Sequence, residues 1–167
     1  DLDLNAASEL VAVAMKTFGL NAQDAAAIAD NFVGAADAST AEVSDLAQAL
    51  TNVGPTMAQF GYGLDDTNTA LAILSTRGIK GAEAGTALKS MMTNLMRPTT
   101  QVKDALAALN VSLYDQNGAL KPLPAIMAEL STAMAGMSEE QRNQTIQTLA
   151  GTYGMKAMAT LLEEGTA

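Results

Sequence analysis

The sequence predicts an all-α protein, and three observations carry that prediction. Apolar residues recur at helical spacing along most of the 167 residues, beginning with the series Ala7, Leu10, Val11, Ala14, Met15 and Phe18. Alanine, the strongest helix former, is abundant, and only 4% of the residues are aromatic. Helix-capping residues and glycines stand where the periodic segments begin and end. We therefore expect a compact domain of about eight or nine helices.

The first part of the chain divides into helices at local start and stop signals. Gly19 closes the first apolar series, and Asn21 is placed to cap the second helix. Ser39, with Glu42 three residues later, has the spacing of a capping box and predicts the start of a third helix. Pro55 interrupts the apolar pattern of that helix, so we expect either a kinked helix or two abutting helices.

The next two helices meet at a glycine-rich corner. Gly78 follows a periodic apolar run, where a left-handed residue ends a helix. Gly81 lies just before the next helix, which we expect from about Ala82 until shortly before Pro98. Gly85 falls inside that helix, where glycine costs about 0.5–1 kcal/mol relative to alanine. We interpret Gly85 as a place where another backbone approaches, so Gly85→Leu should destabilise the fold by more than about 1 kcal/mol.

The last third of the chain has a different pattern. Thr99 or Thr100 is expected to cap a short helix. Residues 111–121 alternate in polarity around Asn117-Gly118, the strongest short turn signal. This segment predicts one short β-hairpin, which would need support from the helices because a hairpin of this length is marginal alone.

The remaining residues predict two helices and a final helical segment. Ser138 and Gln141 have capping-box spacing at the start of the second of these helices. We expect one α-helical domain over residues 1–167, with a subdivision into a helical-pair part, 1–97, and a hairpin with C-terminal helices, 98–167. Similar short segments recur about 40 residues apart, so stacked helical hairpins and an irregular bundle both remain open.

The composition argues against catalysis and against nucleic-acid binding. The sequence has no His and no Cys, which are the residues most used as general bases, metal ligands and activated nucleophiles. Its net charge is −9 and it has no basic stripe that could displace counterions from nucleic acid. The longest apolar runs fall far short of the ~20 residues of a membrane span. We expect no enzymatic activity, catalytic residue, cofactor or metal, no direct nucleic-acid contact and no membrane span.

Two other interpretations of the glycine corner fail on neighbouring residues. A phosphate-binding loop would need a Gly-Lys-Ser/Thr triplet after the glycines, and none follows. Gly81 and Gly85 have the spacing of a membrane dimerisation motif, but no apolar segment of ~20 residues surrounds them. The interpretation of the glycine corner that remains is close packing between helices.

The glycine corner also carries a family resemblance. Its signature residues are Gly78, Ile79, Gly81, Ala84, Gly85, Thr86, Ala87 and Leu88, followed by Leu95 and Pro98. This segment resembles the core region of the phage tail tape measure protein family, and the agreement extends in order along nearly all of the chain. Residues 151–154 lie where the family tends to have a Phe-Gly element. Two positions depart from the family pattern: Asn110, where a glycine is usual, and the Thr152-Tyr153 substitution within residues 151–154.

The resemblance implies a structural virion protein of a long-tailed phage or prophage, which sets tail length and organises tail tube assembly. The implied partners are other tape measure copies, tail tube and tail tip proteins, and tail assembly chaperones. The implied location is the phage tail, and the host cytoplasm during assembly. Because the chain starts at Asp1, we expect it to be part of a longer protein. On the residues alone, a helical-repeat adaptor of a cellular protein and a membrane-active or cell-wall-degrading segment remain alternatives.

Overall fold

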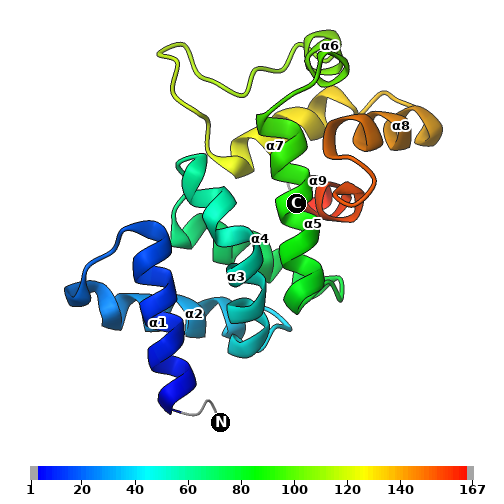
Figure 1. The fold of residues 1–167 in the computed structure, drawn as a ribbon. Helices are drawn as coiled ribbons and strands as arrows, with labels where there is room; N and C mark the ends of the chain where they lie inside the picture. The colour runs from blue at the N-terminus through cyan, green and yellow to red at the C-terminus, as the bar shows by residue number, and fades with distance from the viewer. Residues whose placement is uncertain (1–3, 165–167) are drawn as a thin grey trace. The chain divides into compact units, whose positions relative to one another are not determined.

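The computed structural model describes residues 4–164 (Figure 1). Over this range it has nine α-helices, one short 3-10 helix and no strand, so the all-α prediction is confirmed. The elements are α1 (Leu4–Phe18), η1 (Ala22–Asp24), α2 (Ala25–Asp37), α3 (Val43–Gln59), α4 (Leu64–Thr76), α5 (Gly81–Met96), α6 (Thr100–Ala108), α7 (Leu123–Ala133), α8 (Glu139–Ala150) and α9 (Met155–Glu164). The chain divides into two compact units: unit 1 ends at Thr86 and unit 2 begins at Ala87, inside α5.

Unit 1 contains α1 to α4 and the start of α5. Helices α1 and α4 each pack against both α2 and α3, and Figure 1 shows α1 beside α3. The periodic apolar residues of these helices form the core, whose largest fully buried side chains are Phe32, Leu46, Leu50, Met57, Leu71 and Leu74. Burying each such side chain contributes about 1.5–3 kcal/mol, so the amphipathic stripes hold unit 1 together.

The start of α3 differs from its prediction. The capping box expected at Ser39 is wrong, because α3 begins at Val43 and its N-cap is Glu42. The Glu42 N–H donates a hydrogen bond to the Asp45 carboxylate at 3.0 Å. The Ser39 hydroxyl instead donates to the Ala35 carbonyl oxygen at 2.8 Å, near the end of α2. The Ser39–Glu42 pair and the Glu42–Asp45 pair both have the spacing of a capping box. Helix α3 begins at the second pair.

Helix α3 continues through Pro55 as one element, so the alternative of two abutting helices is wrong. Proline removes one backbone N–H from the helical ladder. The helix tolerates this loss because it is buried on both sides of the proline, through Leu50, Val53 and Met57.

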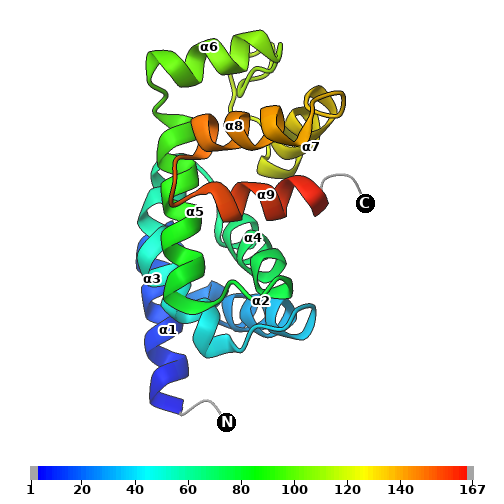
Figure 2. The ribbon, with the colours of Figure 1, turned by 90° about the vertical axis from the view of Figure 1, so that its right-hand side faces the viewer.

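Unit 2 contains the rest of α5 and helices α6 to α9. Helix α9 packs on α7 and α8, and α8 also packs on α6, as Figure 2 shows. The core is rich in methionine, which fills irregular gaps between helices; it includes Leu88, Met91, Met92, Leu95, Ile126, Leu130, Met158 and Leu162.

Two predicted caps in unit 2 are confirmed. Thr99 is the N-cap of α6, and its hydroxyl oxygen accepts a hydrogen bond from the Val102 N–H at 3.4 Å. Ser138 and Gln141 form the reciprocal capping box of α8: the Ser138 hydroxyl oxygen accepts from the Gln141 N–H at 3.2 Å, and the Gln141 side-chain oxygen accepts from the Ser138 N–H at 3.1 Å. Each bond satisfies a backbone donor at a helix start.

The predicted β-hairpin at residues 111–121 is wrong. Among the described residues this segment contains no strand, only an isolated antiparallel bridge between Tyr114 and Leu120. Two backbone hydrogen bonds make this bridge, from the Lys121 N–H to the Leu113 carbonyl oxygen at 2.9 Å and from the Asp115 N–H to the Ala119 carbonyl oxygen at 2.8 Å. The paired segments are too short to form a stable two-stranded ladder.

The turn itself lies where the sequence predicts it. Gly118 has a φ of +80°, and the Asp115 N–H donates to the Ala119 carbonyl oxygen at 2.8 Å. The Asp115 carboxylate accepts hydrogen bonds from the N–H groups of Asn117, at 2.8 Å, and Ala119, at 3.0 Å. Side-chain hydrogen bonds of Asp115 therefore hold this loop together with the backbone bonds of the bridge.

Candidate functional site

Gly85 lies where the start of α5 crosses α3, and there is no room for a side chain. A Cβ atom at Gly85 would lie 2.6 Å from the Ala49 carbonyl oxygen, 2.8 Å from the Asn52 Cβ and 3.0 Å from the Ala49 Cα. Real Cβ atoms essentially never approach other atoms within 3.0 Å. Two of the three obstacles are backbone atoms, which cannot rotate away. Only glycine allows the two helices to come this near without a backbone shift.

Two amide side chains of α3 bind the first turns of α5 beside this contact. The Gln48 Oε1 accepts a hydrogen bond from the Ala82 N–H at 3.2 Å, one of the donors that a helix start leaves unpaired. The Asn52 Nδ2 donates to the Ala82 carbonyl oxygen at 3.4 Å and to the Thr86 hydroxyl at 3.5 Å. Gly81 has a φ of +56°, and a Cβ there would lie 2.6 Å from the Gln48 Oε1. Gly81 is thus constrained by its backbone, whereas the Gln48 amide is the end of a flexible side chain that can rotate away.

The end of α4 shows why the corner begins with a glycine. Gly78 has a φ of +80°, in the left-handed region that glycine adopts at least cost. The Ile79 N–H donates to the Leu74 carbonyl oxygen at 3.1 Å, and the Ile79 side chain is buried. The Gly78 N–H also donates to the Ser75 carbonyl oxygen at 2.9 Å, and the two bonds together are the hydrogen-bond pattern of a Schellman motif.

The loop between α2 and α3 is tied to the same corner through Thr40. The Thr40 hydroxyl donates to the Ser75 carbonyl oxygen at 2.5 Å, which pairs an acceptor in the last turn of α4. The Thr40 carbonyl oxygen accepts a hydrogen bond from the Lys80 Nζ. The corner therefore contacts two other parts of unit 1, the α2–α3 loop and α3.

The structure distributes the signature residues over both units. Those from Gly78 to Thr86 lie in unit 1, and Ala87 and Leu88 open unit 2. All of them are buried except Gly78 and Thr86. The cluster has the composition of a packing contact, with small or apolar side chains and backbone atoms. Its role in packing remains a prediction until Gly85 is substituted.

A second glycine contact, which sequence reasoning missed, lies in unit 2. A Cβ at Gly154, just before α9, would lie 2.6 Å from the Met91 backbone nitrogen and 2.8 Å from the Met91 Cα. Gly151 has a φ of +74°, and the Asn94 Nδ2 beside it donates to the Ala150 carbonyl oxygen at 3.0 Å. The available signal was a glycine immediately before a predicted helix, as at the glycine corner, but nothing in the sequence named its partner.

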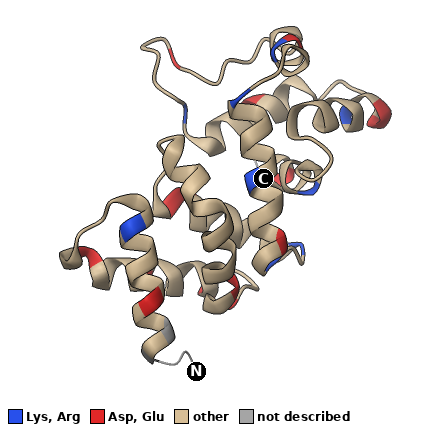
Figure 3. Cartoon of the chain, viewed as in Figure 1, with Lys and Arg blue, Asp and Glu red and all other residues tan. Residues whose placement is uncertain are grey.

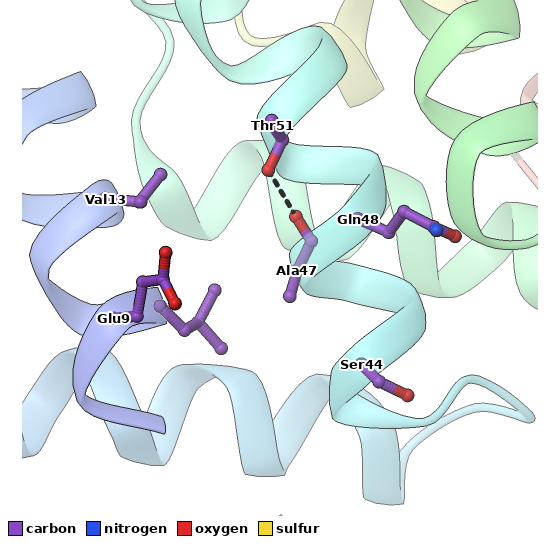
Figure 4. Close-up of a pocket in the computed structure, with 7 residues that line it drawn as sticks. Glu9, Val13, Ser44, Ala47, Gln48 and Thr51 are labelled. Atoms are coloured by element: carbon purple, nitrogen blue, oxygen red, sulfur yellow. Dashed lines mark hydrogen bonds between the residues drawn. The ribbon is translucent and has the colours of Figure 1, made fainter. Parts of the chain in front are cut away.

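A surface hollow of about 350 Å³ lies between α1 and α3 in unit 1 (Figure 4). It is lined by Glu9, Leu10, Val13, Ser44, Ala47, Gln48 and Thr51. The Thr51 hydroxyl is used by its own helix, because it donates to the Ala47 carbonyl oxygen at 3.0 Å. Glu9 is the single carboxylate of this lining, so the hollow offers no acid and base pair.

Titratable groups elsewhere in residues 4–164 are also dispersed. Across that range no group of three or more His, Cys, Asp or Glu side chains could hold a metal ion. Figure 3 shows Lys and Arg residues scattered over separate elements, without a run along one helix. In the described part of the chain, no helix is both long and apolar enough to cross a membrane. The specific feature of this part of the chain is the close helix packing at Gly85 and Gly154.

Comparisons with known proteins agree with the resemblance of the glycine corner. Residues 1–151 match the family described as phage-related minor tail protein. The chain is 38% identical over 163 residues to the tape measure protein of Pneumococcus phage Dp-1, covering 98% of this chain and 14% of that protein. It is 26% identical over 124 residues to the probable tape measure protein of Escherichia phage P2, covering 73% of this chain and 15% of that protein.

The chain thus spans about a seventh of the length of these two relatives. No solved structure matches it. The family match covers most of the chain, and the similarity to the Dp-1 protein covers nearly all of it, including the whole glycine corner. The chain belongs to the phage-related minor tail protein family, in agreement with the predicted membership of the tape measure proteins.

Proposed function

We propose that this chain is a folded, non-catalytic region of a phage tail tape measure protein and that it serves tail assembly. The observation that carries the proposal is the 38% identity to a tape measure protein over 98% of the chain. Dispersed carboxylates and closely packed helices fit a structural role better than an enzymatic one.

The segment contributes to tail assembly as a docking module more than as a stretch of ruler. A ruler converts residues into length, and 167 residues of continuous helix would span roughly 250 Å at ~1.5 Å per residue. In this chain Gly19, Gly78 and Gly151 lie at the ends of helices and have positive φ values. At each of these glycines one helix stops before the next begins. Within residues 4–164 the longest helix is α3, with 17 residues. Tail length would then be set by the whole parent protein, with this region supplying a binding surface.

The proposed partners follow from the family. They are other tape measure copies, tail tube and tail tip proteins, and tail assembly chaperones. The proposed location is the phage tail, with the host cytoplasm as the site of assembly. No direct role in binding nucleic acid is proposed, since basic residues are scattered and the net charge is −9.

Deletion of this region from the parent gene tests the proposal. We expect few tails to assemble, and those that form to be shortened by much less than roughly 250 Å in electron micrographs. A matched deletion of equal length, placed in a continuous helical part of the parent protein, should shorten tails by roughly that amount with normal yield. Normal yield together with the full shortening would refute the docking role but keep the ruler. Unchanged tails in normal number would refute both.

A further inference from the structure

Asn117 and Gly118 form the exposed tip of the loop between α6 and α7. Gly118 has a φ of +80° and its N–H donates to the Asp115 carbonyl oxygen at 3.1 Å, a single bond outside any helical ladder. The Asn117 side chain therefore stands on an exposed turn, next to a backbone nitrogen that carries no bulky neighbour.

The eight other asparagines of the chain are placed differently. None of them is followed by glycine, so a side chain on the next residue hinders access to its backbone nitrogen. Most lie inside α-helices, where the ladder holds the following N–H in a fixed geometry; these are Asn31, Asn52, Asn68, Asn94 and Asn143. Asn110 is followed by Val111, whose buried, β-branched side chain covers the backbone nitrogen.

We propose that Asn117 is a site of spontaneous deamidation. The Gly118 backbone nitrogen loses its proton and attacks the Asn117 Cγ, forming an N–C bond. The bond from Cγ to the side-chain nitrogen breaks, and that nitrogen leaves as ammonia with the proton. The product is a five-membered succinimide. Water then adds to one of its two carbonyl carbons and opens the ring, giving aspartate at position 117 or isoaspartate, in which the main chain runs through the former side chain.

The modification acts on the loop through Asp115. Either product adds a negative charge two residues from the Asp115 carboxylate that holds the turn. Isoaspartate also adds one methylene group to the main chain between Asn117 and Gly118. The lengthened turn no longer matches the spacing of the Asp115 N–H to Ala119 carbonyl bond, which is 2.8 Å long. Loss of this bond opens the loop tip while α6 and α7 keep their own packing.

Mass spectrometry of the purified chain, incubated at mildly acidic and mildly alkaline pH, tests the proposal. Each event raises the mass by about 1 Da, and peptide mapping locates it. We expect Asn117 to convert faster than all other asparagines, and faster at alkaline pH because the Gly118 nitrogen must be deprotonated. Gly118→Ala should slow the conversion, and Asn117→Ser should abolish it. An intact Asn117, or equal rates at Asn117 and the helical asparagines, would overturn the proposal.

Hydrogen exchange of the aged chain tests the structural consequence. Amide exchange at Asp115 and Lys121 should accelerate in the isoaspartate fraction, with no change in the core of α7. Unchanged protection at both amides would show that the loop does not respond, and would overturn the proposed effect on the turn.

Discussion

Replacing Gly85 by alanine separates two opposing effects on stability. In a helix interior, alanine is more favourable than glycine by about 0.5–1 kcal/mol. Against this gain, the new Cβ would lie 2.6 Å from the Ala49 carbonyl oxygen and 2.8 Å from the Asn52 Cβ. Overpacking of this kind costs about 1–3 kcal/mol, and the upper end applies because the carbonyl is a backbone group of the buried residue Ala49. We therefore expect Gly85→Ala to lower the free energy of unfolding by about 2 kcal/mol, and Gly85→Leu to lower it further.

Gly34→Ala is the matched control. Gly34 also lies inside a helix, α2, but a Cβ there would meet nothing within 4 Å. This substitution should raise the free energy of unfolding by about 0.5–1 kcal/mol through helix propensity alone. Urea unfolding followed by circular dichroism measures both variants. If Gly85→Ala is as stabilising as Gly34→Ala, the packing account of the glycine corner is wrong.

Three further substitutions test other contacts by the same unfolding measurement. Gly154→Ala should destabilise unit 2 by about 1–3 kcal/mol, because its Cβ would lie 2.6 Å from the Met91 backbone nitrogen; a neutral result would refute that contact. Asn110 has a φ of +54°, so Asn110→Gly should be neutral or stabilising by up to about 1 kcal/mol, whereas Asn110→Val should destabilise; the reverse order would contradict the left-handed assignment. Ser138→Ala should cost about 1 kcal/mol by removing the acceptor for the Gln141 N–H, and no loss would show that this cap contributes nothing.

The features that the sequence predicted correctly are local. Gly19 and Gly78 end helices, and Thr99 and Ser138 cap them, because the partner of each signal lies within a few residues. The resemblance also implied a glycine at the position of Asn110, and Asn110 adopts a positive φ of +54°. Asparagine is among the few other residues that tolerate the left-handed region.

The features that the sequence could not predict depend on distant or competing partners. The Gly154 contact joins residues more than sixty positions apart, and no local pattern names Met91 as the neighbour. At the start of α3, the spacing of Ser39 and Glu42 competes with that of Glu42 and Asp45, and spacing alone cannot rank them. Alternation around the Asn117 turn indicated strands, but in the described segment the pairing stops at a single bridge, and hydrogen bonds to the Asp115 side chain hold the turn.

The crossing of α3 and α5 at Gly85 is the central structural claim, and a disulfide tests it most directly. The chain has no cysteine, so the double substitution Asn52→Cys and Thr86→Cys introduces two thiols that can pair only with each other within the chain. The Asn52 Nδ2 and the Thr86 hydroxyl oxygen lie 3.5 Å apart, so these two side chains face each other across the crossing. Under mild oxidation the double variant should form an intramolecular disulfide rapidly while folded and slowly in urea, and each single variant should form none. Equal rates in the folded and unfolded chain, or no disulfide when folded, would contradict the crossing.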